Sequence, residues 1–240
     1  MLGEPILRLD ETDSTNRVAL DWADAPGGAC VVARSQTRGR GRLGRSWSSP
    51  ANAGLYLSLV WRPESGENLA HFSLATALGV ALALEKLAPD AQFRLKWPND
   101  VLCLTKHGEA RKIGGILCEA KGGRIVLGIG LNVRHEAAEL PDRPLFPASS
   151  LRLETGRDFE IEAVLQATLR ELDGVLSANF ADWRLEWMRR CYGLGELVRV
   201  QTESQTETGI FDGIGDDGAL LLRTAGGLKS VFAGDVAYPA

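Results

Sequence analysis

The sequence predicts an α+β fold, in which a mixed, mainly antiparallel sheet with packed helices is followed by a small all-β domain. Short turns separate four consecutive strand-like segments between residues 92 and 133, and short connections favour antiparallel pairing. Two long segments, 69–88 and 160–177, have the apolar character of packed helices. In residues 192–240, short strand-like segments alternate with glycine-rich turns, which leaves residues 1–191 as the main domain.

The first half of the chain combines strand-like segments with two helical ones. Asp13 or Ser14 is expected to cap the first helix. The run Leu69–Ala88 is the most apolar in the chain, but polar and charged residues interrupt it, so we interpret it as a buried core helix rather than a membrane span. In order, we expect a strand at Ile6–Leu9, a helix at Ser14–Trp22, strands at Ala29–Ser35 and Gly54–Arg62, and the helix at Leu69–Ala88.

The second half supplies the paired strands and the clearest helix. Pro98 ends one strand, and the Asn99-Asp100 turn leads into the next. The expected strands are Gln92–Trp97, Val101–Leu104, Lys112–Ala120 and Arg124–Val133. A helix at Glu160–Ser177 follows, because Ile161, Val164, Leu165, Thr168, Leu169, Leu172, Val175 and Leu176 fall on one helical face.

Composition limits the classes of function. The 240 residues carry a formal net charge of -4, which argues against a general nucleic-acid binder. The first ten residues do not form a secretory signal, and the four cysteines form no CxxC pair. We therefore expect a cytoplasmic protein with reduced thiols and no membrane attachment. The three histidines are too scattered to predict a zinc site.

The segment 36–47, QTRGRGRLGRSW, concentrates four arginines between glycines. Glycines let a backbone approach a ligand closely, and arginines form charge-assisted bonds with phosphate or carboxylate. The pattern indicates a phosphate-binding loop, but not a Walker A loop, because no Gly-Lys-Ser/Thr follows. A solvated basic loop or an RNA-binding arm is the alternative. Because the segment has little apolar surface to bury, we expect that nothing in the free protein offsets the entropy of ordering it, and that it is mobile until it closes over a bound ligand.

Three further motifs place polar groups beside turns or glycines. LKWPND puts Lys96, Asn99 and Asp100 at the end of a strand, where Asp100 offers a magnesium contact, but a plain turn explains the same residues. RKIGGILCE sets Lys112 beside two glycines, which either open space for a flat ligand or belong to an ordinary hairpin. DSTN, which begins at Asp13, fits a helix cap equally well.

Taken together and in this order, the motifs resemble those of biotin protein ligases, which attach biotin to carrier lysines. The resemblance rests on STN at Ser14–Asn16, GRGRLGRSW at Gly39–Trp47, KWPND at Lys96–Asp100, KIGGIL at Lys112–Leu117, GIGLNV at Gly128–Val133, DGALLL at Asp217–Leu222 and AGDV at Ala233–Val236. It implies a class II synthetase-like catalytic domain and a C-terminal SH3-like β-barrel. Because the motifs begin at residue 13, we expect the monofunctional type, without the DNA-binding domain of the family's repressors.

The resemblance also implies a reaction and its site residues. Biotin and ATP, with Mg²⁺, would form biotinyl-5'-AMP, which a lysine of a biotin carboxyl carrier protein then attacks. Carried over by position, biotin binding falls to Ser14, Thr15, Asn16, Gln36, Arg40, Gly41, Arg42, Lys112 and Gly115, and ATP binding to Arg42, Trp47, Lys96, Asn99, Asp100 and Asn132. The predicted catalytic residues are Arg40, Arg42, Lys112 and Asp100, with Asp100 as a metal contact or as the base for the incoming lysine.

Two other functions stay open from the sequence. A lipoate ligase shares the fold, but GRGRLGR stands where that family has an RRxSGGG-type motif. A non-catalytic biotin sensor or carrier-binding protein would not need the phosphate-binding residues. The sequence leaves open whether the protein forms a homodimer and which carrier it modifies.

Overall fold

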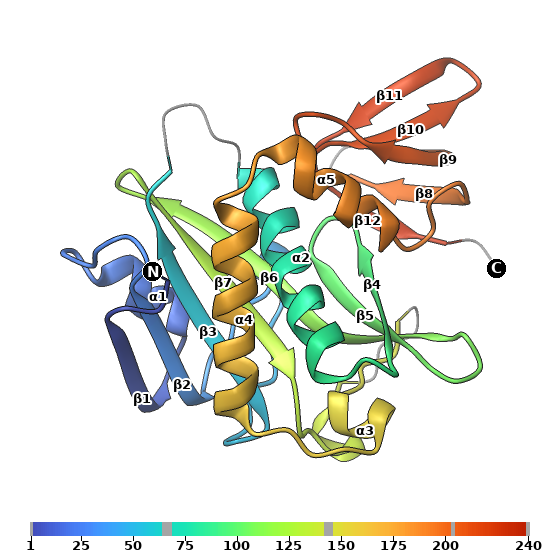
Figure 1. The fold of residues 1–240 in the computed structure, drawn as a ribbon. Helices are drawn as coiled ribbons and strands as arrows, with labels where there is room; N and C mark the ends of the chain where they lie inside the picture. Colours follow the sequence, from blue (N-terminus) through green and yellow to red (C-terminus); the bar gives the residue numbers. More distant parts are fainter. Residues whose placement is uncertain (1, 64–68, 142–145, 203–204, 239–240) are drawn as a thin grey trace.

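The computed structural model describes residues 2–63, 69–141, 146–202 and 205–238 (Figure 1). Within these residues, the main sheet has the strand order β1-β2-β3-β7-β6-β5-β4, and a C-terminal sheet has the order β11-β10-β9-β8-β12. The strands are β1 (Ile6–Thr12), β2 (Cys30–Gln36), β3 (Gly54–Trp61), β4 (Gln92–Lys96), β5 (Asp100–Leu104), β6 (Ala110–Lys121), β7 (Arg124–Asn132), β8 (Leu197–Gln201), β9 (Thr206–Ile214), β10 (Leu220–Thr224), β11 (Gly227–Val231) and β12 (Asp235–Ala237). The α-helices are α1 (Thr15–Asp21), α2 (Leu69–Leu87), α3 (Leu151–Thr155), α4 (Ile161–Leu176) and α5 (Phe180–Arg189).

Short connections produce antiparallel pairing through most of the main sheet. Strands β4, β5, β6 and β7 follow one another along the chain and pair antiparallel, as their turns predict. Strands β1 and β2 instead run parallel, with Ile6 opposite Cys30, because α1 carries the chain back between them. The predicted mixed, mainly antiparallel sheet is confirmed, and the parallel pair adds a detail that the sequence reasoning lacked.

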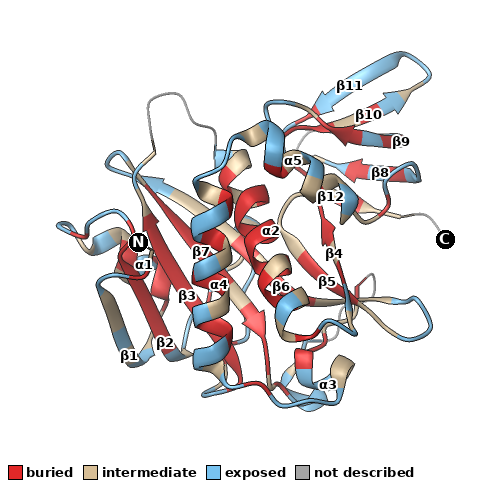
Figure 2. Cartoon of the chain, viewed as in Figure 1, coloured by how far each residue is buried: buried red, intermediate tan, exposed pale blue. Residues whose placement is uncertain are grey.

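Helices α2 and α4 lie side by side over one face of the main sheet (Figure 1). On α4, Val164, Leu165 and Leu172 are buried, as the predicted apolar face requires, and the outer side of the helix is exposed (Figure 2). Helix α2 is long and apolar enough to cross a membrane by length and composition, but most of it is buried between the sheet and α4. It is therefore the core helix that the sequence predicts.

The C-terminal sheet is joined to the main core. Phe211 and Leu220 are fully buried and belong to the same hydrophobic cluster as α2 and β3. Helix α5 packs against β9 and buries Trp187. The sequence reasoning missed α5, although Trp183 and Trp187 stand four residues apart, which is the spacing of one helical face. The all-β character of this part is confirmed, and a boundary at residues 191 and 192 stays a prediction.

Candidate active site

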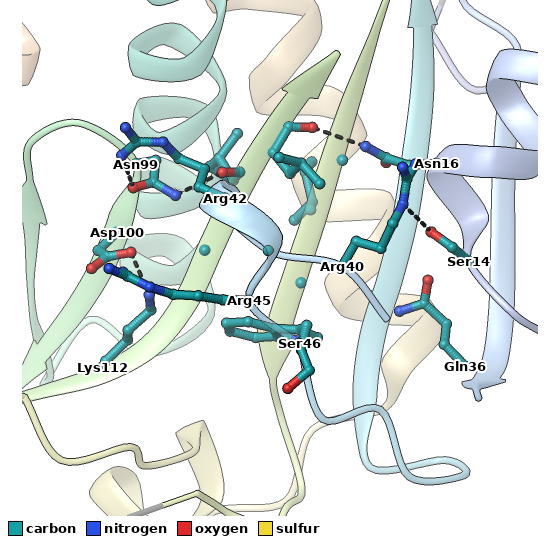
Figure 3. Close-up of a pocket in the computed structure, with 18 of the residues that line it drawn as sticks. Ser14, Asn16, Gln36, Arg40, Arg42, Arg45, Ser46, Asn99, Asp100 and Lys112 are labelled. Atoms are coloured by element: carbon teal, nitrogen blue, oxygen red, sulfur yellow. Dashed lines mark hydrogen bonds and ion pairs between the residues drawn. The ribbon is translucent and has the colours of Figure 1, made fainter. Parts of the chain in front are cut away.

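A cavity of about 320 Å³ gathers side chains from distant segments of the chain. Its lining comes from the start of α1, the end of β2, the arginine-rich segment, the end of β4, the start of β5, the middle of β6 and β7, and β12 of the C-terminal sheet. In Figure 3, Asn16, Ser14 and Gln36 lie on one side of the cavity, and Asn99, Asp100 and Lys112 lie on the other. We call these the polar end (Ser14, Thr15, Asn16, Gln36) and the cationic end (Arg42, Lys96, Asp100, Lys112).

Ser14, Thr15 and Asn16 of the polar end are buried, Gln36 is partly buried, and hydrogen bonds to one another or to neighbouring residues hold all four. The Thr15 backbone N–H donates to Gln36 Oε1 at 2.9 Å. Asn16 Nδ2 donates to the Leu117 carbonyl at 3.0 Å and to Glu119 Oε2 at 2.8 Å. A fixed set of neutral donors and acceptors is suited to an uncharged polar ring.

Ser14 shows that the DSTN motif is more than a helix cap. Its backbone occupies the N-cap position of α1, but its side chain makes no capping hydrogen bond. Instead, Ser14 Oγ accepts a hydrogen bond of 3.4 Å from Arg40 Nε. The predicted N-cap position is confirmed, but the Ser14 side chain lines the cavity instead of capping the helix.

The cationic end holds one carboxylate against two ammonium groups. Asp100 forms an ion pair with Lys112 Nζ, and Lys96 Nζ lies 3.8 Å from its other oxygen. Burial alone would raise the pKa of Asp100, but Lys112, Lys96 and Arg42 together hold it below its usual value. Burial lowers the pKa of Lys96, and Asp100 partly offsets this. This end therefore carries excess positive charge in a water-poor place, where an anion is bound strongly.

Asp100 does not have the surroundings of a resident metal ligand. Its two oxygens face Lys112 and Lys96. Among the described residues, no group of three His, Cys, Asp or Glu side chains could hold a metal ion. Magnesium bound with nucleotides takes most of its ligands from phosphate and water. The residues present therefore do not fit a magnesium site of the protein's own.

Two glycines of β7, Gly128 and Gly130, leave room for the side chains of Asn16 and Trp47 to lie against this strand. A Cβ added to Gly128 would lie 2.1 Å from Asn16 Oδ1, and one added to Gly130 would lie 2.5 Å from the Trp47 ring. Both distances are shorter than any van der Waals contact. The GIGLNV motif thus brings the backbone close to Asn16 of the polar end and to Trp47.

Three arginines of the segment 36–47 have partners elsewhere in the protein. Arg40 forms an ion pair of 2.7 Å with Glu119, Arg42 donates to Asn99 Oδ1 at 3.0 Å, and Arg45 forms an ion pair with Asp235. The expectation that nothing in the protein offsets the ordering of this loop is therefore wrong. Ion pairs offset part of the entropy cost of ordering the loop, although the loop buries little apolar surface.

The contact between Arg45 and Asp235 gives a prediction about this loop. Asp235→Asn removes the charge that attracts Arg45, so trypsin should cleave within residues 38–45 severalfold faster than in the wild type. Asp10→Asn is the matched control, because it disrupts the exposed Arg34–Asp10 pair outside the loop. Equal cleavage rates in all three proteins would show that Asp235 does not hold the loop.

The structure brings nearly all of the predicted site residues to this one cavity. Asn132 is the exception: it lies at a small adjoining cavity with Trp47, Ser48 and Lys112, and its Nδ2 donates to the Ser149 carbonyl at 2.9 Å. Residues that the sequence reasoning missed also line the main cavity, namely Arg45, Ser46, Ile116, Leu117, Gly128, Ile129, Gly130, Phe146, Asp235 and Val236. Gly128 and Gly130 lie in the motif GIGLNV, and their alternation along a strand could have identified them as cavity residues.

Comparisons with known proteins identify the family of this chain. The model of the Biotin/lipoate A/B protein ligase family matches residues 8–135, and that of the Biotin protein ligase C terminal domain matches residues 193–237. The chain is 37% identical over 250 residues to the biotin–[acetyl-CoA-carboxylase] ligase of Paracoccus denitrificans, covering 96% of this chain and 99% of that protein. It is 35% identical over 246 residues to the ligase of the same name from Mycobacterium tuberculosis, covering 95% of this chain and 86% of that protein.

A solved structure is similar over almost the whole chain. The biotin protein ligase of Aquifex aeolicus in complex with biotin and ATP matches with a TM-score of 0.85 and 32% identity, covering 98% of each chain. With a family model over more than half of the sequence and relatives above 30% identity along their length, the chain belongs to the biotin/lipoate A/B protein ligase family.

Proposed function

We propose that the protein is an ATP-dependent ligase that forms biotinyl-5'-AMP from biotin and ATP and then transfers biotin to a lysine of a biotin carboxyl carrier protein. The observation that carries this proposal is one cavity with a neutral polar end and a partly buried cationic end, in a chain of this family. The names of the relatives support acetyl-CoA carboxylase as the source of the carrier.

In the first step, a carboxylate oxygen of biotin attacks the α-phosphorus of ATP, and the bond from this phosphorus to pyrophosphate breaks. Both reactants are anions, so the protein must hold them together and stabilise the charge on phosphorus. Arg42, Lys96 and Lys112 supply positive charge at the cationic end. Asp100 keeps the two lysines oriented through its ion pairs. No further nucleophile is needed, because the substrate itself attacks.

The remaining predicted residues keep the roles that the family resemblance implies. The polar end would take the ring system of biotin, and Gly41 and Gly115 would also contact biotin. Trp47, Asn99 and Asn132 would serve the nucleotide, and Arg40 would cover the biotin from the arginine loop. Magnesium would enter with ATP, coordinated by its phosphates.

In the second step, the amine of the carrier lysine attacks the carbonyl carbon of the adenylate, and AMP leaves. The phosphate of the leaving AMP is stabilised by Arg42, Lys96 and Lys112, as in the first step. A carboxylate with a lowered pKa is a weak base. We therefore assign Asp100 the role of a counter-ion for Lys112 and Lys96, not that of the base for the incoming lysine.

From the sequence we also propose a cytoplasmic location, no binding to DNA, and a division into residues 1–191 and 192–240. The contact of Asp235 with Arg45 gives the second domain a part in the site, since β12 supplies a residue of the cavity.

The first step predicts exchange of labelled pyrophosphate into ATP. Because pyrophosphate is released only when the adenylate forms, exchange should require biotin and should not occur with lipoate. The measurement is the label recovered in ATP with biotin, with lipoate and with neither. Exchange with lipoate but not with biotin would show that the protein is a lipoate ligase. No exchange with either acid would show that it is a non-catalytic binding protein.

A further inference from the structure

Ser58 lies beneath the polar end and belongs to none of the motifs above. It stands in the middle of β3, and it is fully buried. Its Oγ lies 2.8 Å from Thr15 Oγ1 and 2.5 Å from Asn16 Oδ1. A serine hydroxyl has a single proton, so it can donate to only one of these two oxygens.

The partners of Asn16 decide which oxygen receives this proton. Asn16 Nδ2 faces the Leu117 carbonyl and the carboxylate of Glu119, and both of these groups act only as acceptors. The carboxamide must therefore turn its NH₂ group toward them and its carbonyl oxygen toward Ser58. A carbonyl oxygen can only accept, so Ser58 donates its proton to Asn16 Oδ1.

The hydroxyl of Thr15 must then donate to Ser58. The alternative acceptor is Gln36 Oε1, at the longer distance of 3.2 Å, and this oxygen already accepts from the Thr15 backbone N–H. If Thr15 donated there, lone pairs of Thr15 and Ser58 would face each other at 2.8 Å without a proton between them. With its proton committed to Ser58, Thr15 Oγ1 can offer only lone pairs to the cavity that it lines.

We propose that Ser58 is a positioning residue that turns Thr15 into a hydrogen-bond acceptor, so that the polar end selects a ligand carrying an N–H group at this place. The inference rests on the proposed function and deepens it. The ureido ring of biotin has two N–H donors, whereas the dithiolane ring of lipoate has none. Ser58 thus contributes to the choice of biotin without touching it.

Removing the hydroxyl of Ser58 tests this role. In Ser58→Ala, Asn16 Oδ1 loses its donor and the Thr15 hydroxyl is free to rotate. The dissociation constant of biotin, measured by calorimetry, should rise about tenfold, while the KM for ATP and kcat at saturating biotin stay unchanged. Thr168→Val is the matched control, since Thr168 is also fully buried and its hydroxyl has no hydrogen-bond partner among the described residues. Its biotin affinity should equal that of the wild type.

A second measurement needs no variant that could fail to fold. Wild-type protein should bind desthiobiotin at least tenfold more tightly than the analogue in which oxygen replaces both ureido nitrogens, because that analogue has no N–H to donate. In Ser58→Ala this ratio should shrink. Equal binding of the two compounds by the wild type, or Ser58→Ala within twofold of the wild type, would overturn the inference. Failure of the wild type to bind biotin at all would instead overturn the proposed function.

Discussion

Replacing Lys112 with alanine is expected to slow adenylate formation by about a hundredfold or more. Lys112 is the partly buried ammonium that contacts Asp100 and faces the cavity. Removal of one preorganised donor to a developing negative charge costs roughly 10²–10³ in rate. The measurement is single-turnover formation of biotinyl-5'-AMP. A loss below about threefold would contradict the role given to this lysine.

Stability has to be separated from activity in this variant. Lys112→Ala leaves the partly buried Asp100 with Lys96 as its remaining ion-pair partner, and the loss of stability should stay below the about 3–5 kcal/mol that breaking a fully buried pair costs. Asp100→Asn combined with Lys112→Met removes both charges and should recover most of that stability without restoring the rate. If the double variant regains activity together with its melting temperature, Lys112 is only a structural lysine.

The ion pair between Asp100 and Lys112 should make the stability of the protein decrease at low pH. The pKa of Asp100 is lower in the folded protein than in the unfolded chain, where carboxyls titrate near about 4. The pair therefore stabilises the fold above the unfolded pKa, and its contribution is lost as pH falls through the folded pKa. The difference in unfolding free energy between wild type and Lys112→Ala should be largest near neutral pH and should shrink below about pH 4.

Gly128→Ala is expected to weaken biotin binding by about a hundredfold. The new methyl group would lie 2.1 Å from Asn16 Oδ1, so the Asn16 side chain must move. The backbone of β7 cannot retreat, because β3 and β6 pair with it on both sides. Displacement of Asn16 breaks its hydrogen bonds to Leu117 and Glu119 and disorders the polar end. Calorimetric titration with biotin measures the effect.

Gly174→Ala is the control for this substitution. Gly174 lies in α4, is exposed, and has nothing within 4 Å of an added Cβ. Alanine there should leave biotin binding unchanged and stabilise the protein by about 0.5–1 kcal/mol, as in other helices. Normal biotin affinity in Gly128→Ala would show that the polar end is not the biotin site.

Local patterns predicted the main strands and helices but not α3 and α5, and the site residues were predicted from the family resemblance. Short turns after Pro98 and between β6 and β7 set the antiparallel order, which places Asp100 opposite Gly115 and brings Lys112 to its side chain. The alternation of Gly128 and Gly130 lies on one face of a strand, where close approach of side chains requires glycine.

Contacts between distant segments had no local signal. Asp235 reaches Arg45 across 190 residues, and only the seating of the C-terminal sheet brings them together. Glu119 and Ser58 were unremarkable in sequence, because Glu119 ends a motif singled out for its lysine and glycines and Ser58 lies inside an ordinary apolar strand. Their importance comes from the hydrogen-bond partners that the fold supplies, namely Arg40 and Asn16.

The most direct test of the central claim is the intact mass of a carrier. The protein is incubated with a biotin carboxyl carrier domain, biotin and MgATP, and parallel samples contain lipoate or lack ATP. The account predicts that the carrier gains the mass of biotin less one water on a single lysine, only with biotin and ATP together, while ATP is converted to AMP and pyrophosphate. An unchanged carrier mass with biotin and ATP, or a gain with lipoate alone, would contradict it.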